Sequence, residues 1–187
     1  MIDNLINQHC SNPTVGIAYI YCNFRRKDGQ KLNDLLASIL KQLSETKSSL
    51  PEAAEELYKR HSSKRTRLST DELSKTLQSI AGSYLTAFIV VDALDECQMS
   101  ESCRTRFLDE CFALQDRCGA KLFITSRFLP RITERFSKKD LLEIRAKKDD
   151  IERYLEGRIS KLAGFVQRDR HLQKEIIKEI SEAVDGM

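Results

Sequence analysis

The chain has 187 residues, of which 41% are hydrophobic and 32% are charged, with 7 glycines and 3 prolines. This composition excludes a disordered or fibrous protein and is typical of a globular domain that is rich in helix. The formal net charge of +3 argues against nucleic acid as a partner. The longest purely apolar run, residues 87–91, is too short to cross a bilayer, so we expect a cytoplasmic protein without membrane contact.

The first elements alternate between strand and helix patterns. Residues 15–24 (VGIAYIYCNF) are apolar on both faces and rich in β-branched and aromatic side chains, which predicts a buried parallel strand. A shorter helix is expected over residues 51–61, followed by a polar and basic surface loop over residues 62–67. Between the strand at residues 15–24 and the helix at residues 51–61, helical spacing of apolar residues predicts a longer helix that packs on the sheet. Its apolar stripe consists of Leu32, Leu35, Leu36, Ile39, Leu40 and Leu43.

The middle of the chain holds a capped helix and the most apolar strand. Ser69 and Glu72 form the Ser-x-x-Glu pattern of a capping box, so a helix is predicted to begin there and to end near Gly82. Residues 87–91 (AFIVV) predict a central strand that leads directly into an acidic turn, residues 92–96.

In the second half, a helix with an apolar face is expected to end at Gly119, which readily takes the left-handed cap conformation. Residues 121–125 predict a third strand, residues 140–145 (DLLEIR) a weaker fourth one, and two amphipathic helices complete the chain. Alternating strands and helices predict an α/β fold, a parallel sheet flanked by helices. We expect an α/β core over residues 1–146 and the start of a helical region over residues 147–187.

The acidic turn after the central strand is the strongest candidate for a functional site. Ligands of parallel α/β proteins gather outside the carboxyl ends of the strands, where Asp92 is placed. Its carboxylate could serve a hard cation such as Mg²⁺, and Asp95 or Glu96 could orient a water molecule that attacks a terminal phosphate. Acidic turns after strands are also common without any such function, so both interpretations stay open.

Four segments resemble parts of NACHT domains, the nucleotide-binding domains of STAND-class P-loop NTPases. FIVVDALDEC (88–97) resembles their Walker B element, LFITSR (122–127) their sensor strand, and YIYCNF (19–24) the strand before their leucine-rich helix. Residues 149–155 are similar to the segment that opens the helical region after the sheet. The group that they resemble is the fungal one with nephrocystin-like amino-terminal NACHT domains.

The resemblance implies a nucleotide-operated switch that acts in signalling of the innate-immunity or heterokaryon-incompatibility kind. Binding of ATP or GTP with Mg²⁺ would change the domain arrangement and promote assembly. Partners would be other protein domains or further copies of the chain, reached through flanking regions. The residues implied are Asp92 at the Mg²⁺ site, Asp95 and Glu96 as catalytic acids that polarise the water, and Thr125, Ser126 and Arg127 as cofactor-binding sensor residues.

The chain departs from the family pattern at its amino terminus. No glycine in the sequence is followed by lysine, so the Gly-x-x-x-x-Gly-Lys-Ser/Thr loop that cradles phosphates is absent. Residues 1–6 are expected to be the tail of the helix after this loop, and the family's first strand is missing as well. That strand would lie between residues 122–125 and 141–145, so unpaired backbone groups are expected there. We therefore expect a fragment that does not hydrolyse nucleotide and is marginally folded or aggregation-prone by itself.

Two other functions stay open. The same scaffold could serve as a nucleotide-free protein–protein interaction module. The basic segment 59–67 could bind nucleic acid, but it lacks interleaved aromatic residues and favours a solvated loop.

The six cysteines of the chain include no Cys-x-x-Cys pair, which argues against a zinc site and favours a reducing compartment. Cys97 is interpreted as structural, because its acidic neighbours would raise a thiol pKa.

Overall fold

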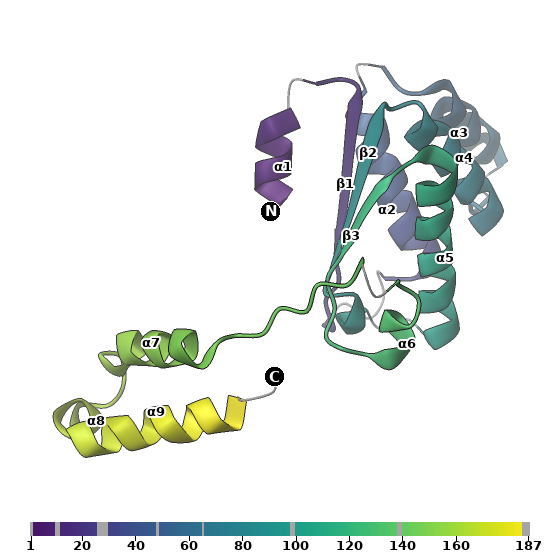
Figure 1. Cartoon of the computed structure of the whole chain (residues 1–187). Coiled ribbons are helices and arrows are strands. Elements are labelled where there is room, and N and C mark those ends of the chain that lie inside the picture. The colour runs from purple at the N-terminus through teal and green to yellow at the C-terminus, as the bar shows by residue number, and fades with distance from the viewer. Residues whose placement is uncertain are drawn as a thin grey trace. The chain divides into compact units, whose positions relative to one another are not determined.

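The computed structural model of the chain describes residues 2–9, 12–25, 30–47, 49–64, 66–97, 100–137 and 140–184. The chain divides into two compact units, residues 1–130 and residues 131–187. The first unit holds the sheet and the second is helical (Figure 1). The boundary between an α/β core and a helical region that the sequence predicts at residues 146 and 147 stays a prediction.

Three parallel strands form the sheet, in the order β1 (Val15–Tyr21), β2 (Thr86–Asp92) and β3 (Lys121–Ile124). β2 lies in the centre and pairs with β1 along its whole length. This confirms the predicted α/β fold and the central position of residues 87–91. The helices are α1 (Ile2–His9), α2 (Leu32–Glu45), α3 (Glu52–Lys64), α4 (Thr70–Gly82), the 3₁₀ helix η1 (Leu94–Glu96), α5 (Glu101–Cys118), α6 (Pro130–Thr133), α7 (Lys148–Ile159), α8 (Gly164–Arg168) and α9 (Arg170–Val184).

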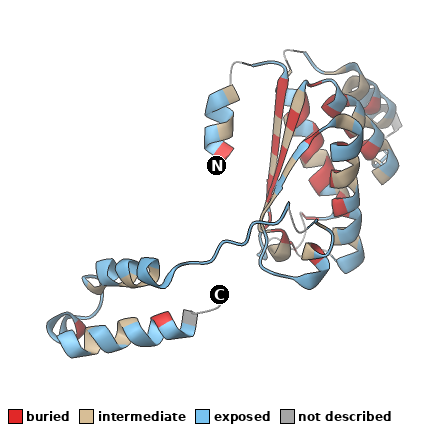
Figure 2. Ribbon diagram, in the orientation of Figure 1, coloured by how far each residue is buried: buried red, intermediate tan, exposed pale blue. Residues whose placement is uncertain are grey.

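One face of the sheet is covered by α2, α4 and α5 and forms the main hydrophobic core (Figures 1 and 2). Side chains of alternate strand residues, such as Ala18, Ile89 and Val91, are fully buried there. The predicted apolar stripe of α2 is buried as a whole, from Leu32 to Leu43. Because burial of a Leu or Ile side chain stabilises a fold by about 1.5–3 kcal/mol, this stripe is a main source of stability.

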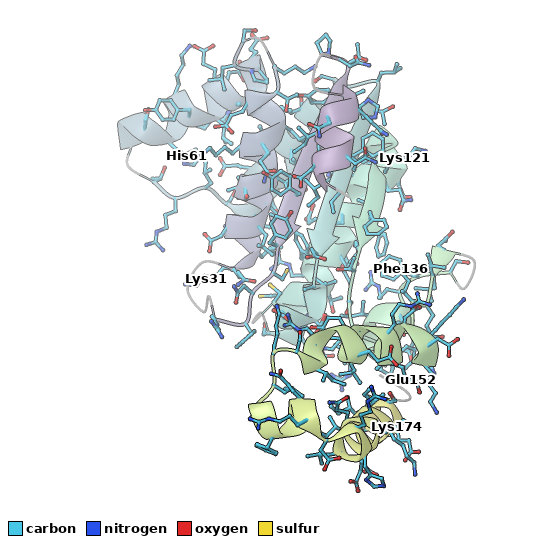
Figure 3. All side chains as sticks on the ribbon, turned by 90° about the vertical axis from the view of Figure 1, so that its left-hand side faces the viewer. Lys31, His61, Lys121, Phe136, Glu152 and Lys174 are labelled. Carbon is cyan, nitrogen blue, oxygen red and sulfur yellow. The ribbon has the colours of Figure 1, made fainter. Side chains whose placement is uncertain are left out.

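The opposite face of the sheet carries α1 (Figure 3). The expected helix at the amino terminus is thus present, although Met1 lies outside the described residues. The ring of His9 stacks on Phe88, with 5.6 Å between the ring centroids. Tyr21 and Phe123 nevertheless remain 58% and 46% exposed. This face is therefore only partly covered.

Gly16 on β1 allows α2 and the Tyr84 side chain, which follows α4, to approach the sheet closely. A Cβ atom at this position would lie 2.9 Å from Leu43 Cδ2 and 2.9 Å from the ring of Tyr84. Neither neighbour can move freely, because the Tyr84 hydroxyl donates a hydrogen bond to the carbonyl of Leu43 inside the core. The close contact depends on the absence of a side chain at residue 16.

We expect Gly16→Ala to lower the free energy of unfolding by about 1–3 kcal/mol, because the added methyl group overpacks the core. Gly82→Ala is the matched control, since the nearest atom to its Cβ would be Cys118 Sγ at an ordinary 3.9 Å. Urea unfolding of both variants compares the two sites directly. Equal stability of Gly16→Ala and wild type would contradict this account of the packing.

The two outer edges of the sheet differ. On β1, the side-chain amide of Gln42 accepts a hydrogen bond from Tyr19 N (2.9 Å) and donates one to Tyr19 O (2.8 Å). On β3, the backbone groups of Leu122 and Ile124 face away from β2, because alternate residues of a strand point to opposite edges. No strand among the described residues pairs with this side of β3. β3 is therefore an open edge strand.

Side chains at the start of α4 tie it to α3. The predicted capping box is present, with Glu72 N donating to Ser69 Oγ and Ser69 N donating to Glu72 Oε2. His61 Nε2 lies 3.0 Å from Oε1 of the same carboxylate, and His61 Nδ1 lies 2.7 Å from Thr66 Oγ1. The hydrogen bonds from Ser69, followed by that from His61, lower the pKa of Glu72 from 4.5 to about 2.

We expect the contacts of Glu72 to make stability depend on pH in acid. A carboxyl group with a lowered pKa in the folded state stabilises the fold above its unfolded pKa, and this contribution is lost as the pH falls. The loss should occur between pH 4.5 and about 2 and should be smaller in Glu72→Gln. Urea titrations at about pH 7, 5 and 3 measure it. Asp71→Asn, an exposed acid in the same helical turn, should retain the wild-type dependence.

Glycine ends the two helices that frame the central strand in sequence. α4 ends at Gly82 and α5 at Cys118, followed by Gly119 with φ of 67° in the left-handed region. The N–H of Gly119 donates to the carbonyl of Gln115, which satisfies one free carbonyl of the last turn. Both predicted helix ends are confirmed.

Two predicted boundaries are wrong. α3 continues to Lys64, so residues 62–64 are helical and not part of a loop, because both the ring and the carbonyl of His61 bond Thr66 and hold the last turn together. The side chain of Lys64 and all of Arg65, which belong to the basic segment, lie outside the described residues. β1 ends at Tyr21 instead of residue 24, because the paired part of β2 ends at Asp92 opposite it.

The predicted fourth strand is also wrong. Residues 141–147 have no regular structure, and the apolar side chains of Leu142 and Ile144 are exposed. A strand needs a neighbour to satisfy its backbone, and within the described residues no strand pairs with this segment. The pattern of apolar residues was therefore insufficient to define a strand here.

The second unit contains the two helices expected at the carboxyl end, α7 and α9, with the short α8 between them. α7 and α9 pack on each other, and Val166 and Ser181 are buried. Most other side chains of the unit are exposed (Figure 2). Among the described helices of the chain, none combines the length and the apolar composition needed to cross a membrane.

Candidate functional site

The site lies at the carboxyl ends of β2 and β3, where Asp92 and Thr125 meet. Asp92 is the last residue of β2, and Thr125 directly follows β3. The Thr125 hydroxyl donates to Asp92 Oδ1 at 2.5 Å and accepts from Ala93 N at 2.8 Å. The half-buried carboxylate of Asp92 is therefore held in one orientation by a residue of the neighbouring strand.

Ala93 turns the chain sharply after the central strand. Its φ of 54° and ψ of 51° lie in the left-handed region, and it is the one non-glycine residue in the described part of the chain with a positive φ. Such a conformation costs about 1–3 kcal/mol and persists when surrounding contacts fix it. Thr125 provides these contacts, because its hydroxyl binds Ala93 N and its carbonyl accepts from Leu94 N at 2.9 Å. The sequence predicted an acidic turn at residues 92–96 but not the left-handed conformation of Ala93, since alanine gives no signal for it.

The turn brings the Asp95 carboxylate into contact with Arg127. Arg127 N donates to Asp95 Oδ1 at 3.0 Å, and Arg127 Nε donates to Oδ2 at 2.6 Å. The Asp95 side chain is 4% exposed, whereas the Arg127 side chain is 82% exposed. Burial acts to raise the pKa of Asp95, but the side-chain and backbone hydrogen bonds of Arg127 outweigh it and hold the pKa below its ordinary value. The same hydrogen bond raises the pKa of Arg127.

The remaining predicted residues, Glu96 and Ser126, belong to neither the Asp92–Thr125 pair nor the Asp95–Arg127 pair. Glu96 is half-buried at the end of η1, and its charge further raises the pKa of Arg127. Ser126 is exposed, and its hydroxyl donates to the carbonyl of Arg127 at 2.8 Å. The structure thus brings Asp92 to Thr125 and Asp95 to Arg127, with Glu96 close to the second pair.

A divalent cation fits this arrangement in one specific way. In the described part of the chain, no group of three or more His, Cys, Asp or Glu side chains is placed to hold a metal ion. The Asp95 carboxylate is paired with Arg127, so Asp92 is the oriented carboxylate that remains for a cation. Mg²⁺ in nucleotide sites takes one or two carboxylates and completes its shell with water and phosphate oxygens. Asp92 fits that mode and not a cage made of protein ligands alone.

The family model described as nephrocystin 3, N-terminal, matches residues 1–127. The chain belongs to the nephrocystin 3 N-terminal family. No curated protein matches the chain. The family match confirms the predicted nephrocystin-like domain. The matched residues include the whole sheet and every candidate site residue.

For this nephrocystin-like domain, we expect Thr125→Val to destabilise the fold by about 1–3 kcal/mol. The substitution keeps the side-chain shape but leaves Ala93 N and Asp92 without their shared partner. Thr125→Ser keeps the hydroxyl and should lose much less. Denaturant unfolding of both variants distinguishes the loss of hydrogen bonds from the loss of a methyl group, and an equal loss would contradict the assigned role.

Proposed function

We propose that this nephrocystin-like domain is part of a nucleotide-operated signalling switch of the NACHT type, built on a P-loop NTPase-like sheet. The observation that carries the proposal is the oriented carboxylate of Asp92 at the carboxyl end of the central strand. Ligands of parallel α/β sheets bind at this end of the strands. The resemblance of residues 88–97 to a Walker B element supports the same site.

The roles in this proposal follow from the positions of the side chains. Asp92 would hold Mg²⁺ directly or through its water, and the cation would supply charge neutralisation for the phosphates of ATP or GTP. Asp95 and Glu96 lie on the turn that follows and would orient the attacking water. Thr125, Ser126 and Arg127 would form the sensor for the terminal phosphate.

The ion pair between Asp95 and Arg127 supports an exchange of partners in the switch. Asp95 is buried and fixed by the fold, whereas Arg127 is mostly in solvent and can reorient. We expect Arg127 to leave Asp95 for a phosphate oxygen, which frees the carboxylate to accept a proton or bind water. The mostly solvated Arg127 side chain can reorient, but the buried carboxylate that it leaves then needs a new partner, which a proton or a water molecule would supply.

The chain lacks the lysine and glycine residues of a phosphate-binding loop. We therefore propose weak binding of Mg²⁺ and nucleotide without hydrolysis by these 187 residues alone. The partners would be other protein domains or further copies of the chain. We propose a cytoplasmic location, which is supported by the five described cysteines, all of them free thiols as a reducing compartment would keep them.

Isothermal titration calorimetry with ATP or GTP and Mg²⁺ tests the proposal. We expect a dissociation constant below about 1 mM for wild type and at least a tenfold loss in Asp92→Asn. This variant keeps an oxygen that can accept from Thr125 but removes the charge that attracts Mg²⁺. Asp116→Asn, an exposed acid on α5, removes the same charge elsewhere and should bind as wild type does. Absence of binding in wild type, or equal binding by both variants, would contradict the proposal.

A second candidate function is a nucleotide-free protein–protein interaction module on the same scaffold. It is supported by large apolar side chains on the less covered face of the sheet, Tyr21 and Phe123. Exposed apolar patches often mark contact surfaces with other proteins. Calorimetry separates the two functions, because the module requires no nucleotide binding that depends on Asp92.

A further inference from the structure

The outer edge of β3 presents backbone groups that have no partner in the described part of the chain. Thr125 N donates to the central strand, so the backbone groups of Thr125 and Phe123 lie on the side of β2. Leu122 and Ile124 direct their N–H and C=O groups the opposite way, because alternate residues of a strand face opposite edges. Among the described residues, no hydrogen bond reaches these outward groups.

The side chains of β3 leave this edge accessible. Phe123 is 46% exposed, and Lys121, which labels the strand in Figure 3, is exposed as well. Both side chains lie on the same face of the sheet as that of Thr125, because successive side chains of a strand alternate between the faces. The segment contains no proline, and its register with β2 shows no bulge. It therefore lacks two of the devices that keep edge strands from pairing.

We propose that β3 pairs in antiparallel orientation with β3 of a second copy of the chain, around a two-fold axis beside Phe123. Leu122 of each copy then lies opposite Ile124 of the other, and both residues of such a pair exchange their backbone hydrogen bonds. The outward groups of β3 thereby obtain partners in both copies. Identical chains suit this arrangement, because one surface serves on both sides of the axis and the assembly closes at two copies.

The side chains favour this alignment. The two Phe123 rings lie directly opposite each other on one face of the joined sheet, where aromatic pairs across strands are stabilising. Lys121 lies opposite Thr125 of the second copy, whose hydroxyl binds the negatively charged Asp92 carboxylate. A parallel alignment in register would instead bring the two Lys121 side chains together, and like charges in opposite positions destabilise a sheet.

The contact is expected to be weak and reversible. A single pair of short strands buries less surface than the roughly 1,200–2,000 Å² of stable protein complexes. The proposal goes beyond nucleotide binding and does not depend on it. It assigns a surface for a second copy to the 187 residues themselves, within the unit that holds the sheet.

Sedimentation equilibrium of the whole chain tests the association. We expect a monomer–dimer equilibrium with a dissociation constant of about 10–100 µM. Phe123→Glu places two like charges opposite each other and should weaken the dimer about tenfold or more. Tyr21→Glu makes the same change at a 58% exposed aromatic residue of β1 and should associate as wild type does. Circular dichroism checks that both variants remain folded.

Cysteine cross-linking tests the register. Phe123→Cys places one thiol of each copy beside the axis, where the backbones are close enough for a disulfide. We expect a disulfide-linked dimer after mild oxidation with oxidised glutathione, with residue 123 joined to residue 123 in the peptide map. Lys121→Cys is the matched control, because its thiols lie at opposite ends of the paired strands. This variant and wild type should remain largely without cross-links.

Hydrogen exchange of wild type distinguishes the second copy from other occupants of the edge. The amides of Leu122 and Ile124 should exchange rapidly in the dilute monomer and about tenfold or more slowly where the dimer prevails. Protection of these amides in the monomer would show that another segment of the same chain covers the edge. That result would overturn the proposal, as would a chain that stays monomeric or equal weakening by Phe123→Glu and Tyr21→Glu.

Discussion

The hydroxyl of Thr125 joins the two strand ends on which the candidate site is built. The central strand brings Asp92 to the rim of the sheet, but the strand alone does not orient the carboxylate or direct the chain that follows. Thr125 does both, because it donates to Asp92 and accepts from Ala93. The left-handed turn at Ala93 then leads to η1, which places Asp95 beneath Arg127. Each later contact of the site depends on this first one.

Local patterns were sufficient to predict most elements of the first unit. The apolar stripe of α2 repeats at helical spacing and lies buried as a whole. The capping box at Ser69 and the glycine at residue 119 mark helix ends through contacts within a few residues. The unbroken apolar run of β2 indicated a strand with neighbours on both sides, and the sheet order agrees. These features share one property, which is that the residues responsible are close in sequence.

Contacts between distant residues could not be predicted in the same way. Thr125 and Asp92 are 33 residues apart, and Arg127 and Asp95 are 32 apart. Their pairing depends on the register of β2 and β3, which no local pattern reveals. Residues 140–145 show the converse error, because a strand-like pattern does not produce a strand without a partner. The assignment of nucleotide-binding roles came from family resemblance and stays a proposal.

The side-chain amide of Gln42 makes the two edges of the sheet unequal as places where a further strand could pair. By occupying the main-chain N–H and C=O of Tyr19, it takes the place that an added strand would need at the side of β1. Leu122 and Ile124 present the corresponding groups of β3 outward. A further strand, whether it belongs to the same polypeptide or to another molecule, would therefore join more readily next to β3 than next to β1. The sheet can be extended on the side of Thr125 and Arg127, so an added strand would lie beside the residues of the candidate site.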